Sequence, residues 1–454
     1  MKFIETLKNI WSIDELRNRI LYTLGILALF RFGCFVVLPG VDSVALAQSM
    51  GSSDANNLLS IINSFTGGAF NSAAVFALGI MPYITASIII QLLGFAVPYF
   101  QKLQQKEGES GRKKITQITR FLTVLITLVQ GGAYLKMIHG TDGAVYQDVN
   151  MSIWWISNII ILSSGTILAM WLGEKITDKG IGNGISLLIM IGIIATLPRA
   201  FVTEIQSQLQ NSGLFVLVLE LAVLFMTVLA CVLIVQGIRR IPLQFAKRMV
   251  GKSSGNVPMA GARDYIPLKV NAAGVMPIIF AQAIMFLPMQ LGSWASQGSE
   301  TPSGFMMQLA DWTSVPYNII FFLLVVVFTY VYTALLVNPQ QYAEYLKRQN
   351  AFIPGIKPGK QTQDYIDSLT TRVTLPGSIF LGFISIFPAI ISRFGVNPGF
   401  ALFFGGTSLL ILVGVVLDFL QQVESYLLMR KYDGLVKSGR LKGRSGMQPI
   451  GAGM

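Results

Sequence analysis

Ten apolar stretches constrain the fold of this 454-residue chain more than any other feature. A helix needs about 20 apolar residues to cross a hydrocarbon core of about 30 Å. Only 12% of the residues are charged, whereas a soluble domain carries about 25%. The predicted spans are 20–39, 73–97, 118–138, 152–173, 183–198, 213–236, 271–290, 316–337, 374–392 and 400–425. We therefore expect an all-α polytopic membrane protein with ten transmembrane helices.

The cations lie on one side of these spans. With the N-terminus in the cytoplasm, 30 of the 34 Lys and Arg residues fall in segments that face the cytoplasm. The opposite loops, 40–57, 139–151 and 291–315, contain none. Because cytoplasmic loops are enriched in cations, this pattern predicts that both termini are cytoplasmic. Residues 1–19 then form an amphipathic surface segment and 426–454 a cytoplasmic tail.

The span count predicts two halves, 20–198 and 213–425. Five spans in each half give the halves opposite orientations, and inverted repeats of this kind build pathways at their shared interface. The interrupted segment 58–70 supports a pathway, because Asn63, Gly67 and Gly68 break it before it can span. Broken helices at membrane depth are tolerated where they line a cavity or are buried in protein.

Two long loops on the basic side, 237–270 and 338–373, mix β-forming residues, prolines, glycines and cations. They could be solvated basic loops attracted to anionic lipids. Their length and aromatic content favour docking surfaces for a cytosolic partner.

Other functions find less support in the residues. A secondary transporter of small solutes is the alternative, but it should place ionisable groups near the midplane. Arg31 is the most central charge and fits a structural or cavity-facing role, whereas Glu220 and Asp418 lie within reach of an interface.

An intramembrane hydrolase could use the hydroxyl of Ser87, Ser163 or Ser164, but the single histidine, His139, lies at the end of a span. We expect no enzymatic activity, no organic cofactor and no metal.

Six motifs cover nearly the whole chain in order and together resemble the bacterial SecY family, whose members are channel subunits of the protein-conducting translocon. The motifs are FALGIMPYITASIIIQLL (76–93), KEGESGRKKITQITR (106–120), MWLGEKITDKGIGNGIS (170–186), PLKVNAAGVMPIIFA (267–281), AFIPGIKPGKQTQDYID (351–367) and FGGTSLLILVGVVLDF (404–419).

The resemblance implies a central hourglass pore closed at mid-membrane by a ring of apolar side chains. The matching positions are Ile80, Ile84, Ile185, Ile189, Ile279 and Ile411. Residues 58–70 match the plug of the family, and its predicted residues are Leu58, Leu59, Ile61, Ile62, Phe65, Gly67 and Gly68. We expect few contacts to hold this plug, because a strongly buried segment would be locked in place.

The resemblance also implies a lateral gate between spans two and three on one side and spans seven and eight on the other, with a polar cluster at Thr85, Gln130 and Asn271. Hydrogen bonds across helices would hold the gate at modest strength, about 0.6 kcal/mol each.

The two basic loops match those that the family offers to the SecA ATPase and the ribosome. The matching cations are Arg239, Arg240, Lys247, Arg248, Lys357 and Arg372. The family usually has arginine at the position of Lys357, and lysine keeps the charge but loses the planar fork. The resemblance further implies the membrane subunits SecE and SecG, unfolded preproteins and signal sequences as partners, and a place in the bacterial plasma membrane.

Overall fold

The computed structural model describes residues 11, 13–52, 58–105, 108–141, 143–146, 150–211, 214–245, 263–295, 308–309 and 311–437. In the N-terminal part the helices are α2 (Asp14–Gly33), α3 (Ser43–Ser52), α4 (Leu58–Phe65), α5 (Met81–Ala96), α6 (Pro98–Gln105), α7 (Gly108–His139), α8 (Met151–Lys179) and α9 (Gly184–Asn211). In the C-terminal part they are α10 (Leu214–Gln236), α11 (Met276–Ala295), α13 (Val315–Leu336), α14 (Pro339–Arg348), α15 (Lys360–Arg393), α16 (Pro398–Ala401) and α17 (Gly406–Lys437). The strands are β1 (Ile238–Phe245), β2 (Arg263–Lys269) and β3 (Ala351–Phe352).

Each of the ten predicted spans coincides with a helix, namely α2, α5, α7, α8, α9, α10, α11, α13, α15 and α17. Among the described residues, seven helices are long and apolar enough to cross a membrane. The apolar parts of α5 and α11 are shorter, and the first turns of α2 carry Asp14, Glu15, Arg17 and Arg19. The chain is therefore an all-α polytopic membrane protein, as its sequence predicts.

The predicted span 73–97 is wrong in its first third, because α5 begins only at Met81. Residues 66–80 form a series of turns, in which Ala73 and Gly79 adopt positive φ angles of 46° and 53°. A 16-residue helix is about 24 Å long at about 1.5 Å per residue. The turns connect back to the end of the first span, where Leu38 N–H donates to the Ala73 carbonyl at 2.8 Å.

The boundary predicted between the surface segment 1–19 and the first span is also displaced. Residues 14–19 already belong to α2, which ends at Gly33 rather than at residue 39. At the other terminus α17 continues to Lys437, so the predicted tail begins as an extension of the tenth span. Residues 438–454 lie outside the described part of the chain.

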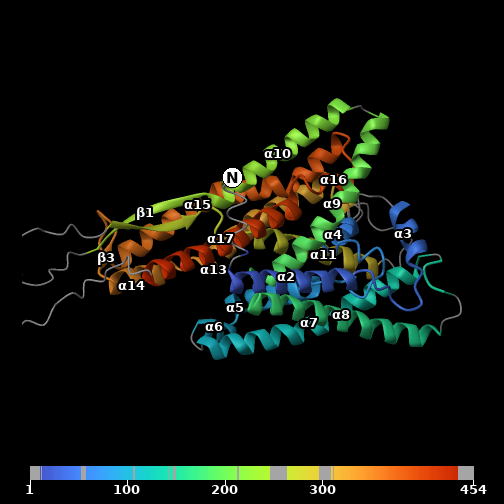
Figure 1. Ribbon diagram of the computed structural model, residues 1–454, viewed down its shortest axis with the longest axis horizontal. Helices are drawn as coiled ribbons and strands as arrows, with labels where there is room; N and C mark the ends of the chain where they lie inside the picture. The colour runs from blue at the N-terminus through green and yellow to red at the C-terminus, as the bar shows by residue number, and fades with distance from the viewer. Residues whose placement is uncertain are drawn as a thin grey trace, which may run out of the picture.

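The two long basic loops are folded together into one unit. β1 from the first loop pairs antiparallel with β2, and its far end pairs with β3 from the second loop. Apolar side chains of the strands pack against α14 and the first turns of α15, forming a separate small core. Figure 1 shows β1, β3 and α14 at one end of the long axis and α3 at the other. We call these ends the basic end and the far end.

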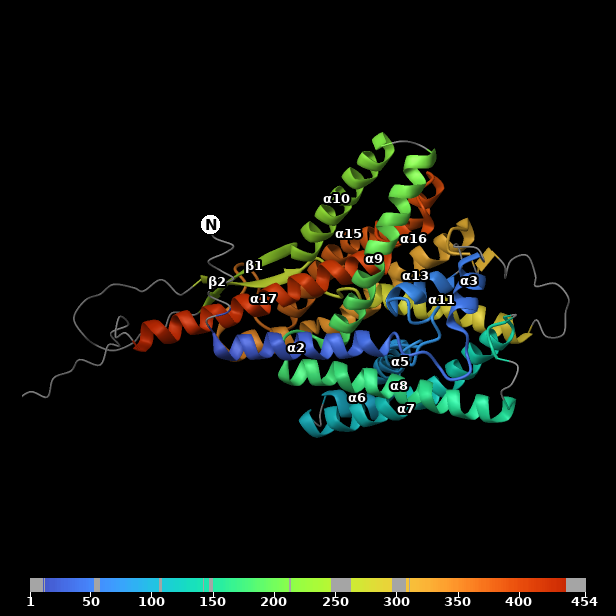
Figure 2. The ribbon, with the colours of Figure 1, turned by 45° about the vertical axis from the view of Figure 1, so that its right-hand side comes forward.

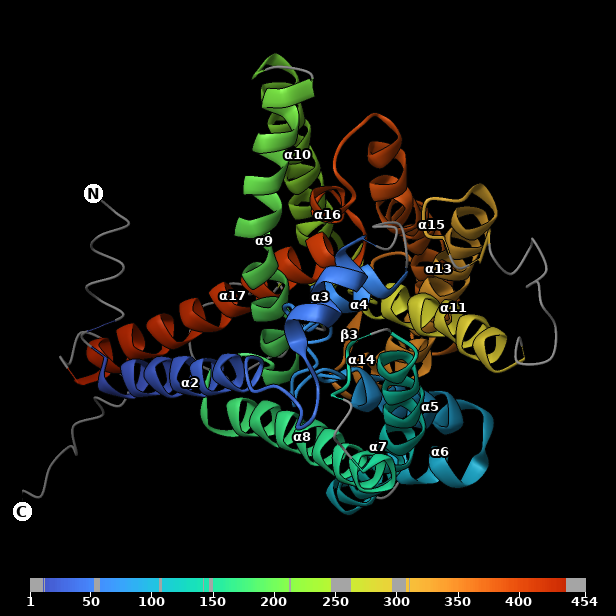
Figure 3. The same ribbon diagram turned by 90° about the vertical axis from the view of Figure 1, so that its right-hand side faces the viewer.

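The helices surround a short central segment. Seen from the far end, α2, α5, α7 and α8 lie on one side and α10, α11, α13 and α15 on the other, with α4 between the two groups (Figure 3). Figure 2 shows α2 running alongside α8, a contact between the first and fourth spans. α9 and α17 pack against each other and join the two groups. This arrangement places the broken segment at the centre of the bundle.

Candidate functional site

The six isoleucines predicted to form a ring lie on four helices. Ile80 directly precedes α5 and Ile84 lies within it, Ile185 and Ile189 lie on α9, Ile279 on α11 and Ile411 on α17. Ile80, Ile84 and Ile411 are buried, and the other three are partly buried against the same apolar cluster. We call this set the isoleucine collar.

The four helices form a closed circuit. α5 contacts α11, α11 contacts α17, and α17 contacts α9. Ile80, Ile84 and Ile189 line one narrow cavity, which brings α5 and α9 together across the remaining side. The structure therefore gathers the predicted residues around a common centre, and their role as a seal stays a prediction.

The plug lies directly against this collar. Phe65 and Thr66 line the same cavity as Ile80, Ile84 and Ile189. Of the predicted plug residues, Ile62 and Phe65 are buried, and Gly67 and Gly68 have φ angles of 65° and 92° that favour glycine. The side chains of Leu58, Leu59 and Ile61 lie outside the described part of the structure.

A close backbone fit holds the plug against α9. A Cβ atom on Gly192 would lie only 2.2 Å from the Phe65 carbonyl oxygen. A Cβ atom on Gly67 would lie 3.0 Å from the Gly192 Cα and 2.2 Å from Arg31 Nη1. Only glycine at both positions lets the two backbones approach this closely.

Two side chains from neighbouring helices hold the same segment by its carbonyl groups. Arg31 Nη1 on α2 donates to the Gly67 carbonyl at 3.1 Å. Tyr134 Oη on α7 donates to the Phe70 carbonyl, and the Tyr134 and Phe70 rings pack at a tilt of 47° with their centroids 4.7 Å apart. The expectation that few contacts hold the plug is therefore wrong. We call Arg31, Tyr134 and Gly192 the plug seat.

The plug seat was missed in the sequence, except that Arg31 was expected to have a structural or cavity-facing role. Its contact with Gly67 agrees with that expectation. Gly192 and Tyr134 sit in apolar spans where a glycine or tyrosine ordinarily serves packing. Since the contact pairs are 36 or more residues apart, no local pattern connects them.

The predicted polar cluster of the lateral gate is not joined by hydrogen bonds among the described residues. Thr85 Oγ1 donates to the Met81 carbonyl of its own helix at 3.0 Å. Asn271 is 8% exposed, and its Oδ1 has no hydrogen-bond partner in the described structure. Gln130 is half-buried on α7. The expectation of hydrogen bonds across the gate is therefore wrong, although α5 and α11, the second and seventh spans, do pack against each other. We call the contact between α5 and α11 the seam.

The predicted docking cations are exposed at the basic end. Arg239 and Arg240 lie on β1, and the Arg240 guanidinium stacks over the Tyr265 ring at 4.9 Å. Lys357 is exposed in the turn between β3 and α15, and Arg372 is exposed on α15. Lys247 and Arg248 lie outside the described residues. Because β1 pairs with both β2 and β3, the two loops present their cations from one rigid unit.

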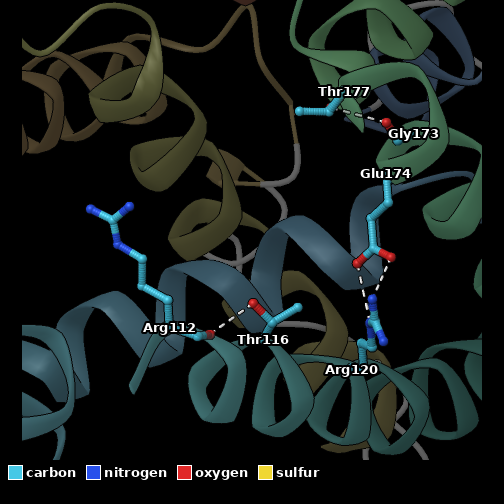
Figure 4. Close-up of polar contacts among 6 residues, drawn as sticks. All are labelled: Arg112, Thr116, Arg120, Gly173, Glu174 and Thr177. Atoms are coloured by element: carbon cyan, nitrogen blue, oxygen red, sulfur yellow. Dashed lines mark hydrogen bonds and ion pairs between the residues drawn. The ribbon is translucent and has the colours of Figure 1, made fainter. Parts of the chain in front are cut away.

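An ion pair fixes the third span to the fourth near the same end. Arg120 on α7 donates through Nε and Nη2 to both carboxylate oxygens of Glu174 on α8, at 3.1 and 2.6 Å. Figure 4 shows this two-pronged contact, while Arg112 points away from it. Paired hydrogen bonds of this kind constrain geometry as well as adding energy. They hold α7 and α8 in a fixed relation at one end of the bundle.

Comparison with known proteins identifies the same family as the motifs. The SecY family model matches residues 74–420. The protein translocase subunit SecY of Chlamydia muridarum is 38% identical over 461 residues, covering 97% of this chain and 99% of the relative. SecY of Streptomyces coelicolor is 39% identical over 444 residues, covering 94% and 98%.

Solved structures share the fold at lower identity. One described as the structure of a protein-conducting channel has a TM-score of 0.62 at 18% identity, with 95% of each chain covered. Sec61 in a canine ribosome–channel complex has a TM-score of 0.54 at 17% identity, also with 95% of each chain covered. Because the family model matches most of the chain and the relatives match almost all of it, this chain belongs to the SecY family.

Proposed function

We propose that this chain is the central channel subunit of a Sec translocon. It passes unfolded secretory proteins across the membrane and releases transmembrane segments into lipid through a lateral gate. One observation carries the proposal: the six isoleucines of the collar belong to one apolar cluster, and three of them line the same cavity as the end of a short, separately seated helix. A narrow apolar constriction excludes ions because they cannot shed their water there. Isoleucine is stiff at χ1, so the collar has a defined bore without specific bonds to a passing chain.

In this proposal the chain spans the bacterial plasma membrane. Its basic end faces the cytoplasm, and both termini lie on that side. The cations Arg239, Arg240, Lys357 and Arg372 dock the SecA ATPase or the ribosome, which supply the driving force. SecE and SecG accompany the chain as small membrane subunits. The relatives' name, protein translocase subunit SecY, and the channel–ribosome complex among the structural neighbours support this assignment.

A secondary transporter is not favoured, because the central charge serves the plug. Arg31 binds the Gly67 carbonyl, Asp418 is exposed, and Glu220 binds Gln208 rather than Arg31. These three charged residues therefore lie in three different environments rather than in one shared site of the kind that a transporter needs.

Removal of residues 58–70 tests the channel. We expect ion conductance in planar bilayers to rise while translocation is partly retained, since the collar would lose its seated helix. A second variant replaces the same residues by glycine and serine, which keeps the length but removes the side chains. Unchanged conductance in both variants would remove the plug assignment.

Substitution of Lys357 tests docking. Lys357→Glu reverses an exposed charge at the basic end, so we expect loss of SecA-driven translocation into vesicles. Lys357→Arg keeps the charge and should be tolerated. Full activity of the Glu variant would refute the docking role of this position.

A further inference from the structure

An apolar groove lies between α13 and α15 toward the far end. It has a volume of about 620 Å³ and is lined mainly by apolar side chains, among them Val315, Ile319, Phe322, Ile386 and Ile390. Ligand pockets for small molecules typically enclose about 300–1,000 Å³. None of these residues belongs to the isoleucine collar, the plug seat or the docking cations.

The groove begins where close packing of the two helices ends. At Gly382 a Cβ atom would lie 2.7 Å from the Phe322 ring, so the helices are in tight contact there. Pro388 lies inside α15, six residues or nearly two turns further on. Proline removes a helical hydrogen bond and clashes with the preceding turn, which bends a helix. The groove occupies the stretch on the far side of the Gly382 contact, from Ile386 to Arg393 on α15 and Phe394 directly after it.

A cation without a carboxylate partner stands at the mouth of this groove. Arg393, the last residue of α15, donates from Nη2 to the Thr313 carbonyl at 3.0 Å. No carboxylate among the described residues forms an ion pair with it. Arg393 is exposed, and the neighbouring Phe394 is 81% exposed. The favourable field at a helix C-terminus explains part of this placement, but it leaves most guanidinium donors free.

The other two polar side chains of the groove are already satisfied. Thr313 Oγ1 donates to Asp311 Oδ1 at 2.7 Å. Asn318 Nδ2 donates to the Trp312 carbonyl at 2.9 Å and to the Ser314 carbonyl at 2.7 Å. Both amide hydrogens are therefore used within the protein. Arg393 remains as the donor that can bind a ligand at this mouth.

We propose that the groove binds one anionic glycerophospholipid, with its phosphate at Arg393 and an acyl chain along the apolar walls. Arginine pairs with phosphate through two parallel hydrogen bonds, and the apolar walls of the groove suit an acyl chain, which is favourably removed from water there. A partner helix fits less well, because the groove has the volume of a small-molecule pocket and a helix would have to supply a carboxylate for Arg393 at its rim. The site is independent of the channel function.

Native mass spectrometry of the purified full chain tests the proposal. The protein is equilibrated with mixed micelles that contain equal amounts of dioleoylphosphatidylglycerol and dioleoylphosphatidylcholine. We expect one phosphatidylglycerol molecule to be retained in preference to phosphatidylcholine. Arg393→Gln should weaken that preference about tenfold, since it removes a charge-assisted hydrogen bond.

Two further variants distinguish binding in the groove from a general attraction of anionic lipids to exposed cations. Arg199→Gln removes an exposed cation from the far part of α9 and should leave the preference unchanged. Ile390→Trp fills the groove without changing charge and should reduce retention of both lipids. The proposal is overturned if the wild-type chain retains both lipids equally, or if Arg199→Gln lowers the preference as much as Arg393→Gln. A bound polypeptide that is displaced by Ile390→Trp would also overturn it.

Discussion

The predicted plug and the seam between α5 and α11 both border the isoleucine collar, but they are held in different ways. The plug is fixed by a backbone fit to Gly192 and by hydrogen bonds from Arg31 and Tyr134 to its carbonyl groups. At the seam, Thr85 bonds within its own helix and Asn271 Oδ1 has no partner in the described structure. Directional contacts therefore hold the plug, whereas packing without hydrogen bonds between the two helices holds the seam.

This difference suits two different demands on a channel. A plug must return to one position after each opening, and hydrogen bonds with a steric fit specify a position. A seam that admits many different helices is better held by apolar packing alone, because hydrophobic contact is non-directional and does not select one partner geometry. We therefore expect substitutions in the plug seat to change ion leak and substitutions at the seam to change the choice of segment. The following variants test that division, from the largest expected effect to the smallest.

Gly192→Val should have the largest effect. Its side chain would start 2.2 Å from the Phe65 carbonyl oxygen, and overpacking of this kind costs about 1–3 kcal/mol. That corresponds to a shift of roughly five- to a hundredfold toward the unseated plug. Conductance of the resting channel in planar bilayers measures it. Gly25→Ala is the matched control, because no atom lies within 4 Å of its added Cβ. A resting Gly192→Val channel that stays closed would contradict the fit.

Arg31→Met should open the resting channel less. It removes the bond to the Gly67 carbonyl, and hydrogen bonds to charged groups contribute about 1.5–3 kcal/mol. Since Arg31 is only half-buried, we expect the lower end of that range. Arg31→Lys keeps the charge without the planar fork and should fall between wild type and Arg31→Met. If single-channel recordings give equal resting open probabilities for all three proteins, Arg31 does not hold the plug.

Tyr134→Phe should have a smaller effect, because one neutral hydrogen bond contributes about 0.5–1.5 kcal/mol. The ring contact with Phe70 is retained in this variant. Labelling of Ser72→Cys by a membrane-impermeant maleimide reports the unseated plug, after replacement of the buried Cys34 and Cys231 by alanine. We expect labelling to be roughly two- to tenfold faster. Tyr146→Phe alters an exposed tyrosine and should leave the rate unchanged, so equal acceleration in both variants would rule out the bond as the cause.

The spans could be predicted because few backbone structures can cross a membrane. Backbone groups in the hydrocarbon region must be satisfied within a helix, so apolar length alone located all ten helices. The start of α5 was misplaced because residues 73–80 are as apolar as a helix but are held in turns by Ala73 and Gly79. The sheet at the basic end could not be read from the loops, since Gln244 pairs with Phe352 more than 100 residues away.

The site was predicted in part for a similar reason. The spacing of Ile80 and Ile84, and of Ile185 and Ile189, places each pair on one helix face. That these residues pack together with Ile279 depends on tertiary structure, which spacing along the chain does not reveal. This part of the prediction rested on the resemblance to a family. The plug seat depends on Gly192, whose missing side chain carries no signal in an apolar span.

The smallest expected effect on ion leak, and the sharpest test of the seam, comes from the polar residues Asn271 and Thr85. Asn271→Leu removes a buried oxygen without a described partner, and burial of such a group costs about 1–3 kcal/mol. The closed seam should become more stable, so a more hydrophobic signal sequence should be needed to open it. Thr85→Val removes only a bond within its own helix and should leave the threshold unchanged. A graded series of signal sequences in a translocation assay measures both. An equal shift in the two variants would mean that the polar residues act as a joined cluster, and the contrast between plug and seam would fail.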